Sequence, residues 1–418
     1  MEKILKWYRE QLSKESSKVE EIPFSELDKW YFDKSTGNLR HESGKFFLVE
    51  GLRITNPQNN KTWEQPIINQ PEIGVLGILT KKIAGERYFL LQAKMEPGNV
   101  NRLQLSPTVQ ATMSNYTRVH SGKKTAFLEY FFEAPPSRIL VDSLQSEQGG
   151  RFFQKRNRNI VVEIDEKIEL TDNFCWVKES HLQHLLGQDN LVNMNARSVL
   201  SCYLTCADFD PANSAHRTIE ITNWITNLKI KYKSEIKLMP LKNVTGWEIR
   251  EDKIAHEAGK YFSIIAVRTS SDSREVNRWT QPIMKETQPG LVGFIKKKIN
   301  GIDHYLVQGK IEPGNIDEIY MTPTVQCSYH NVDGNSYYRS YFLNAKPDQV
   351  KYDALLSEEG GRFYHYRNRY MVIEIDEEIE SSENHKWVSY PQLLEFLRFG
   401  MLNIEARTSI ACMHAGRK

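Results

Sequence analysis

The chain of 418 residues is long enough for two domains, and its 40% apolar residues can form buried cores, so a disordered protein is not expected. The 55 lysines and arginines nearly balance the 53 aspartates and glutamates, which leaves a net charge of +2. This balance lacks the basic excess of nucleic-acid-binding surfaces, so we expect no nucleic-acid partner.

The first predicted element is a helix at the N-terminus, because apolar residues recur at helical spacing within residues 3–12. Residues 1–21 are charged throughout and lack the apolar segment of a signal peptide. The five cysteines are sparse and include no Cys-x-x-Cys pair, which argues against a disulfide framework and against structural zinc. No apolar run is long enough to span a bilayer. We expect a cytoplasmic protein without a membrane partner.

Strands are predicted next along the chain. Residues 73–82 and 86–95 are β-rich runs, and the three residues between them (Ile-Ala-Gly) are typical of a hairpin. Residues 124–133 and 159–165 predict further strands. Residues 139–150 predict a short helix that ends at a Gly-Gly pair, and residues 176–188 predict a helix that buries its leucines. This pattern indicates the α+β class, with a mixed sheet and peripheral helices.

The same series of motifs occurs twice. The string at residues 41–47 (HESGKFF) returns at 256–262 (HEAGKYF), and the string at 192–202 (VNMNARSVLSC) returns at 402–412 (LNIEARTSIAC). The offset falls only from 215 to 210 residues. We therefore predict two tandem homologous domains, a first copy (residues 1–207) and a second copy (residues 208–418), each a globular unit with its own pocket. The boundary lies in a loop rich in Pro, Asn, Ser and Asp.

The longest shared string covers residues 146–165 (SEQGGRFFQKRNRNIVVEID) and 357–376 (SEEGGRFYHYRNRYMVIEID), which are identical at 13 of 20 positions. An arginine beside a Gly-Gly pair suits an oxyanion, because the guanidinium matches phosphate geometry and glycine lets a ligand approach the backbone. We predict that these loops bind substrate through Ser146, Glu147, Gln148, Gly149, Gly150 and Arg151, and through Ser357, Gly360, Gly361 and Arg362. The alternative for the Arg-Asn-Arg triplets is a solvated strand face.

Other repeated residues offer further binding groups. Trp63 and Trp279 stand in polar segments that predict loops, where an indole stacks on a base or sugar, unless it plugs the edge of the core. Lys94 and Lys310 flank Pro-Gly turns and are placed to bind a carbonyl or phosphate, unless they are solvated. Arg197 and Arg407 open the last apolar segment of each copy, and either pair with the preceding helix or reach a ligand.

Several motifs of catalysis and cofactor binding are missing from the sequence. It contains no G-x-G-x-x-G, Walker A, H-E-x-x-H or G-x-S-x-G string. The eleven histidines form no ligand cluster in the sequence. Neither a cofactor nor a metal is therefore predicted.

The repeated strings, among them EPGNVNRLQLSPTVQATMSNYTR, SEQGGRF and NMNAR, closely resemble the NDP-hexose 2,3-dehydratases over nearly the whole chain. The resemblance implies duplicated Nudix-like domains in a homodimer, with a dTDP-sugar pocket in each copy and catalysis in one of them. A Nudix hydrolase needs a box of clustered glutamates that hold Mg²⁺. Where the box would stand, this chain reads NVNRLQLSPTVQATMSNY instead.

The resemblance also implies the substrate dTDP-4-dehydro-6-deoxy-α-D-glucose and a 3-ketoreductase that follows in the pathway. Loss of the C2 hydroxyl requires a base for the C3 proton, a donor to the C4 oxygen, an acid for the leaving hydroxide and a diphosphate clamp. No redox cofactor is needed. A non-catalytic nucleotide-sugar-binding protein and a residual Nudix hydrolase are the alternatives.

On this scheme the catalytic groups are sought where the two copies differ. The first copy offers Tyr116, His120, Glu129 and Tyr130, and in the second copy Ser340 stands in place of Glu129. We therefore predict that the first copy is catalytic. The opposite assignment stays open, because the second copy has Tyr338 and Arg339, and Arg339 is retained as a binding candidate.

Overall fold

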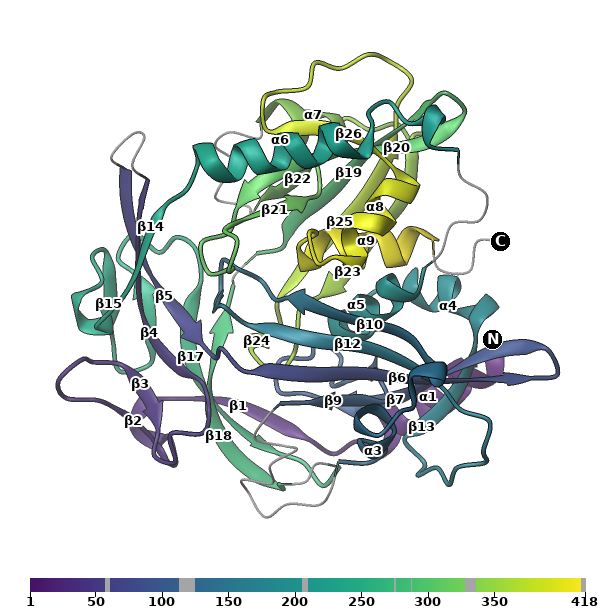
Figure 1. Cartoon of the computed structure of the whole chain (residues 1–418). Coiled ribbons are helices and arrows are strands. Elements are labelled where there is room, and N and C mark those ends of the chain that lie inside the picture. The colour runs from purple at the N-terminus through teal and green to yellow at the C-terminus, as the bar shows by residue number, and fades with distance from the viewer. Residues whose placement is uncertain are drawn as a thin grey trace.

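Strand-forming runs dominate the chain, and in the computed structural model they form four β-sheets flanked by helices (Figure 1). The structure describes residues 1–56, 61–112, 125–204, 210–273, 276–286, 288–327 and 336–414. Strands and helices follow one another along the chain without regular alternation, which agrees with the predicted α+β class. No helix within these ranges has the length and apolar character needed to cross a membrane.

Two of the sheets have seven strands and the same strand order. One sheet belongs to the first copy, in the order β10-β12-β6-β7-β13 with β8 on β7 and β9 on β6: β6 (Ile73–Ile83), β7 (Glu86–Met95), β8 (Leu103–Ser106), β9 (Val109–Ala111), β10 (Ile139–Ser146), β12 (Arg156–Glu163) and β13 (Phe174–Lys178). The other belongs to the second copy, in the order β23-β25-β19-β20-β26 with β21 on β20 and β22 on β19: β19 (Gly290–Ile299), β20 (Ile302–Ile311), β21 (Ile319–Thr322), β22 (Val325–Cys327), β23 (Val350–Ser357), β25 (Arg367–Glu374) and β26 (His385–Ser389).

The central position of strand β6 in its sheet explains why its sequence is an apolar run without alternation. It pairs in parallel with β12 and antiparallel with β7. Leu76 and Ile78 belong to one core, whereas Val75 and Leu79 belong to a second core on the opposite face. A strand that is buried on both faces reads as a continuous apolar run.

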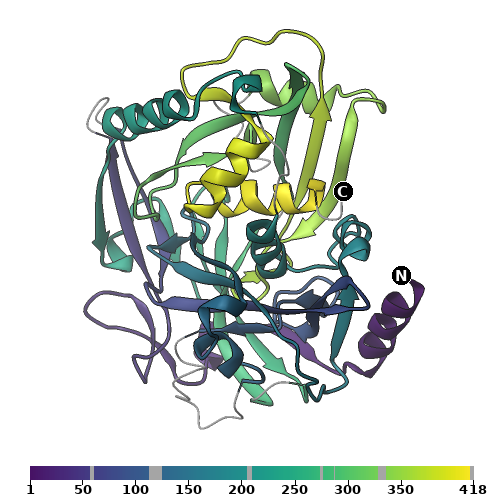
Figure 2. The same cartoon turned by 45° about the vertical axis from the view of Figure 1, so that its right-hand side comes forward.

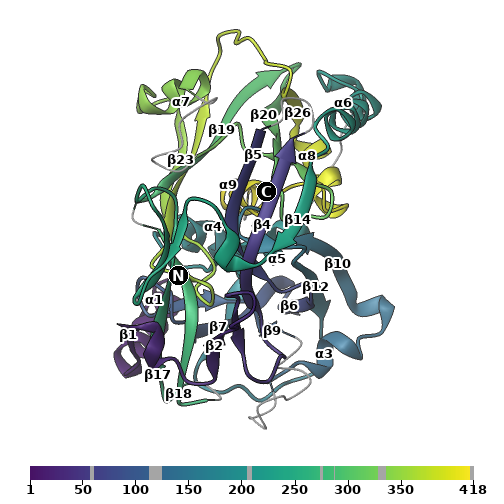
Figure 3. The same cartoon turned by 90° about the vertical axis from the view of Figure 1, so that its left-hand side faces the viewer.

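The two smaller sheets exchange a strand between the copies. The first contains β2 (Trp30–Phe32), β3 (Leu39–His41), β4 (Leu48–Asn56), β5 (Lys61–Asn69), β11 (Phe152–Phe153) and, from the second copy, β14 (Glu235–Met239). The second contains β15 (Trp247–Ile249), β16 (Lys253–His256), β17 (Ser263–Ser270), β18 (Arg278–Lys285), β24 (Phe363–Tyr364) and, from the first copy, β1 (Lys18–Ile22). Figure 3 shows β14 beside β4. The expectation that each copy is a separate globular unit is therefore wrong, because each completes a sheet of the other.

The helices lie outside the sheets, except for one central pair. They are α1 (Glu2–Lys14), α3 (Glu129–Phe132), α4 (Glu179–Leu186), α5 (Met194–Tyr203), α6 (Thr218–Lys231), α7 (Ser336–Leu343), α8 (Tyr390–Arg398) and α9 (Ile404–His414), with single 3-10 turns at Phe24–Glu26, Pro136–Arg138, Pro211–Asn213 and Leu241–Asn243. The equivalent helices α5 and α9 pack on each other in the middle of the molecule (Figure 2).

Several predicted elements are confirmed. The helix predicted at residues 3–12 is α1, and the leucine-rich helix predicted at 176–188 is present as α4, whereas residues 176–178 belong to strand β13. The predicted hairpin joins β6 to β7, and Ala84 and Gly85 adopt φ values of 49° and 83° at its turn. These φ values are those that a two-residue hairpin turn requires.

Other predicted elements are wrong. Residues 139–146 form strand β10 and not a helix, because they pair along their length with β12. Residues 129–132 form helix α3 and not a strand, and Phe131 of this helix lies against Gly77, where a side chain would leave no room for the ring. Trp63 and Trp279 lie in strands β5 and β18 and not in loops, opposite Ile54 and Thr269.

Two pairs of loops hold the copies together. We call residues 96–99 and 312–315 the EPGN turns, and residues 146–151 and 357–362 the Gly-Gly loops. Gly98 donates its N–H to the Gly360 oxygen at 2.7 Å, and Gly314 donates to the Gly149 oxygen at the same distance. A Cβ atom at Gly98 would overlap the carbonyl oxygen of Phe363. Gly98 and Gly314 therefore allow backbone atoms to come close, and these atoms belong to the opposite copy.

We expect Gly98→Ala to lower the free energy of unfolding by about 1–3 kcal/mol or more, because the added methyl group has no room against the opposite backbone. Thermal unfolding followed by circular dichroism measures the effect. Gly150→Ala is the control, since a Cβ there meets no atom within 4 Å. Equal melting temperatures for the two variants would contradict the importance of this contact.

Candidate functional site

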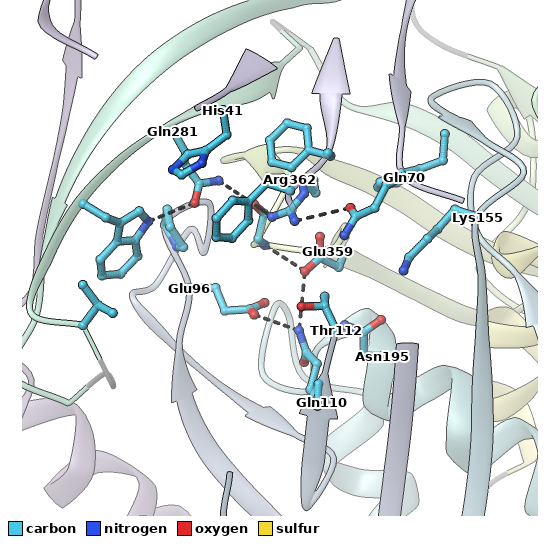
Figure 4. A pocket seen from close by; sticks show the side chains of 18 of the residues that line it. His41, Gln70, Glu96, Gln110, Thr112, Lys155, Asn195, Gln281, Glu359 and Arg362 are labelled. Atoms are coloured by element: carbon cyan, nitrogen blue, oxygen red, sulfur yellow. Dashed lines mark hydrogen bonds between the residues drawn. The ribbon is translucent and has the colours of Figure 1, made fainter. Parts of the chain in front are cut away.

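A cavity of about 330 Å³ lies where the two copies meet (Figure 4). The first copy contributes Lys94, Glu96 and Gln110, whereas the second copy contributes Trp279, Glu359 and Arg362. The repeated motifs predict a pocket within each copy. The lining of this cavity comes from both copies, since the second Gly-Gly loop docks on the first EPGN turn.

The end of strand β7 and the neighbouring strand β9 build one side of the cavity. Lys94 donates to the backbone oxygen of Gln110 at 3.4 Å and lies 3.6 Å from a Glu96 carboxylate oxygen. Gln110 donates through Nε2 to Oε1 of Glu96 at 2.8 Å. The other oxygen of Glu96 is buried and has no hydrogen-bond partner in the part of the chain that the structure describes. A carboxylate oxygen is thus available to a ligand.

Arg362 approaches from the opposite side of the cavity. Its guanidinium lies 4.2 Å from the ring centroid of Phe47 and donates to the Gly361 oxygen at 2.9 Å and to the Gln70 amide oxygen at 3.3 Å. Its Nε is buried without an acceptor among the described residues. A charged donor of this kind, bonded to an amide and a carbonyl, is suited to an anionic group.

Glu359 lies between Arg362 and Glu96. Its Oε1 accepts from the Gly361 N–H at 3.0 Å and from Gln110 Nε2 at 3.5 Å, so one amide group joins the two carboxyl groups. Figure 4 shows Gln110 bonded to both. Burial and the neighbouring Glu96 raise the pKa of Glu359 to about 8. A carboxyl group of this kind holds its proton at neutral pH and can donate it.

The equivalent positions around the second EPGN turn carry different side chains. Arg151 lies 4.3 Å from the Phe262 ring, as Arg362 lies on Phe47, but it pairs with the Glu286 carboxylate at 2.5 Å. Glu286 occupies the position of Gln70. Around the second EPGN turn the Arg151 guanidinium is therefore neutralised by the Glu286 carboxylate.

We call the polar residues around the second EPGN turn the second cluster: Gln148, Arg151, Glu286, Glu312 and Glu405. Its carboxyl groups also stand at different positions from those of the cavity. Gln148 stands where the second Gly-Gly loop has Glu359, and Glu405 stands where the first copy has Asn195. Both oxygens of Glu312, the equivalent of Glu96, accept hydrogen bonds, one from Asn403 at 2.9 Å and the other from Asn315 at 3.0 Å. Both Glu312 oxygens are therefore occupied, unlike those of Glu96, although Gln148 Oε1 and Arg151 Nε are buried without a hydrogen-bond partner among the described residues.

Arg197 and Arg407 are almost completely buried and bond across the molecule. Arg197 donates to the Ser357 oxygen, and Arg407 donates to the Ser146 oxygen, each at 2.5 Å. Neither lines the cavity. The bonds to Ser357 and Ser146 run to the other copy and not to the preceding helix, and a role in ligand binding stays a prediction. Each arginine instead holds the Gly-Gly loop of the other copy.

The remaining predicted binding residues are distributed between the cavity and other places. Glu147 and Gly361 line it, whereas Trp63 is 39% exposed on β5, away from the lining, and Lys310 donates to the Gln326 oxygen beside the second EPGN turn. Arg339 lies on α7. In the Arg-Asn-Arg triplets, Arg158 and Arg369 pair with aspartates of the adjacent strands, as the strand-face alternative describes.

The predicted catalytic residues lie outside the lining or outside the described part of the chain. Glu129 and Tyr130 begin helix α3 and do not line the cavity. Tyr116 and His120 fall within residues 113–124, which are not among the described residues. Their catalytic roles stay predictions.

Sequence reasoning missed the polar groups that the structure gathers in the cavity. These are Gln70, Glu96, Gln110, Lys155, Asn195 and Glu359. Glu359 and Asn195 had a detectable signal, because both differ from their equivalents in the other copy by exchange of a carboxyl and an amide group. Gln110 gave no such signal, since Gln326 matches it.

Among the described residues, no three His, Cys, Asp or Glu side chains are grouped so that they could hold a metal ion. The cavity instead is lined by four carboxyl groups, three lysines and two arginines: Asp28, Glu96, Glu147, Glu359, Lys29, Lys94, Lys155, Arg278 and Arg362. Such a set can transfer protons at one end of a ligand and bind an anionic group at the other.

Comparisons with known proteins agree on one family. The model for NDP-hexose 2,3-dehydratases matches residues 1–203 and 218–413. The dTDP-4-dehydro-6-deoxy-alpha-D-glucopyranose 2,3-dehydratase of Amycolatopsis orientalis is 42% identical over 428 residues, which cover 99% of this chain and 90% of the relative. Proteins of the same name from Saccharopolyspora spinosa and Streptomyces violaceoruber are also 42% identical, over 98% and 97% of this chain and 90% and 95% of the relatives.

We expect Glu359 to be protonated at pH 7 and to lose its proton as the pH rises through about 8. Difference infrared spectroscopy measures this as loss of a protonated carboxyl band that is missing from Glu359→Gln. Glu96→Gln should lower the midpoint, because it removes a neighbouring carboxylate that disfavours ionisation. Ionisation of Glu359 below pH 6 would show that the two groups do not interact in this way.

Proposed function

Because the chain belongs to the NDP-hexose 2,3-dehydratase family, we propose that it acts on dTDP-4-dehydro-6-deoxy-α-D-glucose and removes its C2 hydroxyl as water. The product is a 3,4-diketo-2,6-dideoxy sugar that remains attached to dTDP. The observation that carries this proposal is a cavity that combines two neighbouring carboxyl groups with an arginine on the opposite side.

The elimination matches the chemistry of these groups. The C4 carbonyl of the substrate acidifies the C3 proton, and removal of this proton by a base gives an enolate. The enolate expels the C2 hydroxyl when an acid supplies a proton to it, and the resulting enol becomes the C3 ketone. Water is lost without any net oxidation or reduction, so the proposal requires no redox cofactor.

The opposite side of the cavity fits the nucleotide diphosphate. Arg362 supplies the positive charge, and its Nε has no acceptor among the described residues. Trp30, His41, Phe46 and Trp279 add aromatic surface to the lining. We propose that the base of dTDP stacks on this surface, as stacking on an aromatic ring contributes roughly 1–3 kcal/mol per base.

The fold supports further parts of the proposal. We propose that the chain is a duplication of a Nudix-like domain, since the two seven-stranded sheets share one strand order and the two smaller sheets share another. We also propose a homodimer, and a 3-ketoreductase that consumes the unstable diketo product. Cys175, Cys202, Cys327 and Cys412 are free thiols, which supports a location in the reducing cytoplasm.

Purified protein with the substrate should produce the diketo sugar, and its acid breakdown or reduction by a 3-ketoreductase should report the product. Nuclear magnetic resonance measures loss of the C2 hydroxyl directly. Tight binding of dTDP-sugar without loss of this hydroxyl would favour a binding protein and contradict the proposal. Release of dTMP that depends on Mg²⁺ would instead indicate a Nudix hydrolase.

Gln70→Glu should weaken dTDP binding by about tenfold, because the new carboxylate would pair with Arg362 as Glu286 pairs with Arg151. Isothermal titration calorimetry measures the dissociation constant. Gln70→Leu is the matched control, since it removes the amide without adding charge, and should weaken binding by about threefold at most. Equal effects of the two variants would show that charge at Arg362 does not bind the diphosphate.

A further inference from the structure

The carboxyl pair in the cavity divides the proposed reaction between the first copy and the second copy within one chain. We infer that Glu96 of the first copy removes the C3 proton, and that Glu359, brought from the second copy, protonates the departing C2 hydroxyl. This inference rests on the proposed function. It means that neither copy alone contains a complete catalytic site.

The geometry favours Glu96 as the base. Its Oε1 accepts from Gln110, and its buried Oε2 is without a hydrogen-bond partner in the described ranges of the chain. Lys94 forms an ion pair with this carboxylate at 3.6 Å. The orphan oxygen of Glu96 can therefore receive a proton from a bound ligand.

Glu359 is held in place from both sides of the boundary between the copies. Within its own loop it accepts from the Gly361 N–H at 3.0 Å. The loop is fixed to the first copy by the bond from Gly98 N–H to the Gly360 oxygen at 2.7 Å, and the His365 N–H donates to the Gly98 oxygen at 2.9 Å. These backbone bonds position the Glu359 carboxyl next to Gln110 and Glu96.

The protonation states fit this division of roles. Glu359, with its pKa raised to about 8 by burial and by Glu96, carries a proton at neutral pH and is suited to an acid. Glu147 also raises the pKa of Glu359, whereas Arg362 and the hydrogen bond from the Gly361 N–H lower it. A carboxyl pair in which one member is protonated provides an acid and a base at the same pH.

The bonds and protons of the step balance. The Glu96 carboxylate takes the proton from C3, and the electron pair of the C3–H bond forms the enolate with the C4 oxygen. The C2–O bond then breaks, a C2–C3 double bond forms, and the Glu359 proton leaves with the hydroxide as water. Glu96 has gained one proton and Glu359 has lost one, so a single proton transfer between these neighbours restores the starting state.

The second cluster cannot perform this step in the same way. Gln148, at the position of Glu359, is an amide and has no acidic proton to give. Glu312, at the position of Glu96, has both oxygens occupied by Asn403 and Asn315. The equivalent of Asn315 in the first copy, Asn99, donates to the backbone oxygens of Lys94 and Arg102 instead, and so leaves Glu96 open.

Two reactions of the substrate distinguish the role of Glu96 as the base from the role of Glu359 as the acid. Exchange of the C3 proton in deuterated water reports the base, and loss of the C2 hydroxyl reports the acid as well. We expect Glu96→Gln to reduce both at least 100-fold, and Glu359→Gln to reduce hydroxyl loss at least 100-fold while C3 exchange stays within tenfold of the unchanged protein. Nuclear magnetic resonance measures both rates in one sample.

Glu405→Gln is the matched control, since it alters a buried carboxyl of the second cluster, and it should leave both rates within threefold. Melting temperature and dTDP affinity establish that each variant is folded and binds. Glu359→Asp, which keeps a carboxyl, should recover part of the hydroxyl loss. In the unchanged protein, hydroxyl loss should fall tenfold per pH unit above about 8, while C3 exchange should not.

Hydroxyl loss by Glu359→Gln within tenfold of the unchanged protein would overturn the inference, as would loss of both reactions in Glu405→Gln. Equal loss of exchange and elimination in Glu359→Gln would also overturn it, because Glu359 would then not act after proton removal. If the unchanged protein shows neither reaction, the proposed function itself is wrong. These outcomes are distinguishable in the same experiment.

Discussion

The reciprocal docking of EPGN turns on Gly-Gly loops is the contact on which the rest of the structure depends. Each turn exchanges backbone hydrogen bonds with a loop of the other copy, and a side chain at Gly98 or Gly314 would overlap the opposite backbone. Arg197 and Arg407 reinforce it, since each bonds a carbonyl oxygen of the opposite loop from a buried helix. Because backbone groups make this contact, it places Glu359 and Arg362 beside the first copy's sheet with little freedom.

The same backbone arrangement thus occurs twice in the chain, but its charged side chains differ. The backbone places an arginine on an aromatic ring at Arg362 and again at Arg151, yet an amide accompanies the first and a carboxylate the second. A buried charge whose partners are amides and carbonyls still attracts a ligand of opposite charge, whereas an ion pair is neutral. The same arrangement therefore lines a cavity at one place with an arginine that has no carboxylate partner among the described residues, and holds an ion pair and a fully bonded Glu312 carboxyl group at the other.

Local patterns predicted the elements that depend on local interactions. Helix α1, helix α4 and the β6–β7 hairpin follow from apolar spacing and from turn residues at Ala84-Gly85. The Gly-Gly pair after strand β10 resembles a helix stop and so favours a helix, although Gly149 of that pair instead contacts the other copy. Trp63 and Trp279 were placed in loops because their neighbours are polar, whereas pairing with β4 and β17 keeps them in strands.

The sequence by itself determined the duplication of motifs, the α+β class, the family, and the importance of the Gly-Gly-Arg strings, because each is expressed in residue order and identity. Only the tertiary structure decided which residues meet. Glu96 and Glu359 are more than half the chain apart in sequence, and they become neighbours because strands and loops are exchanged between the copies. Such long-range pairing depends on the shape of both copies at once, and no local pattern contains it.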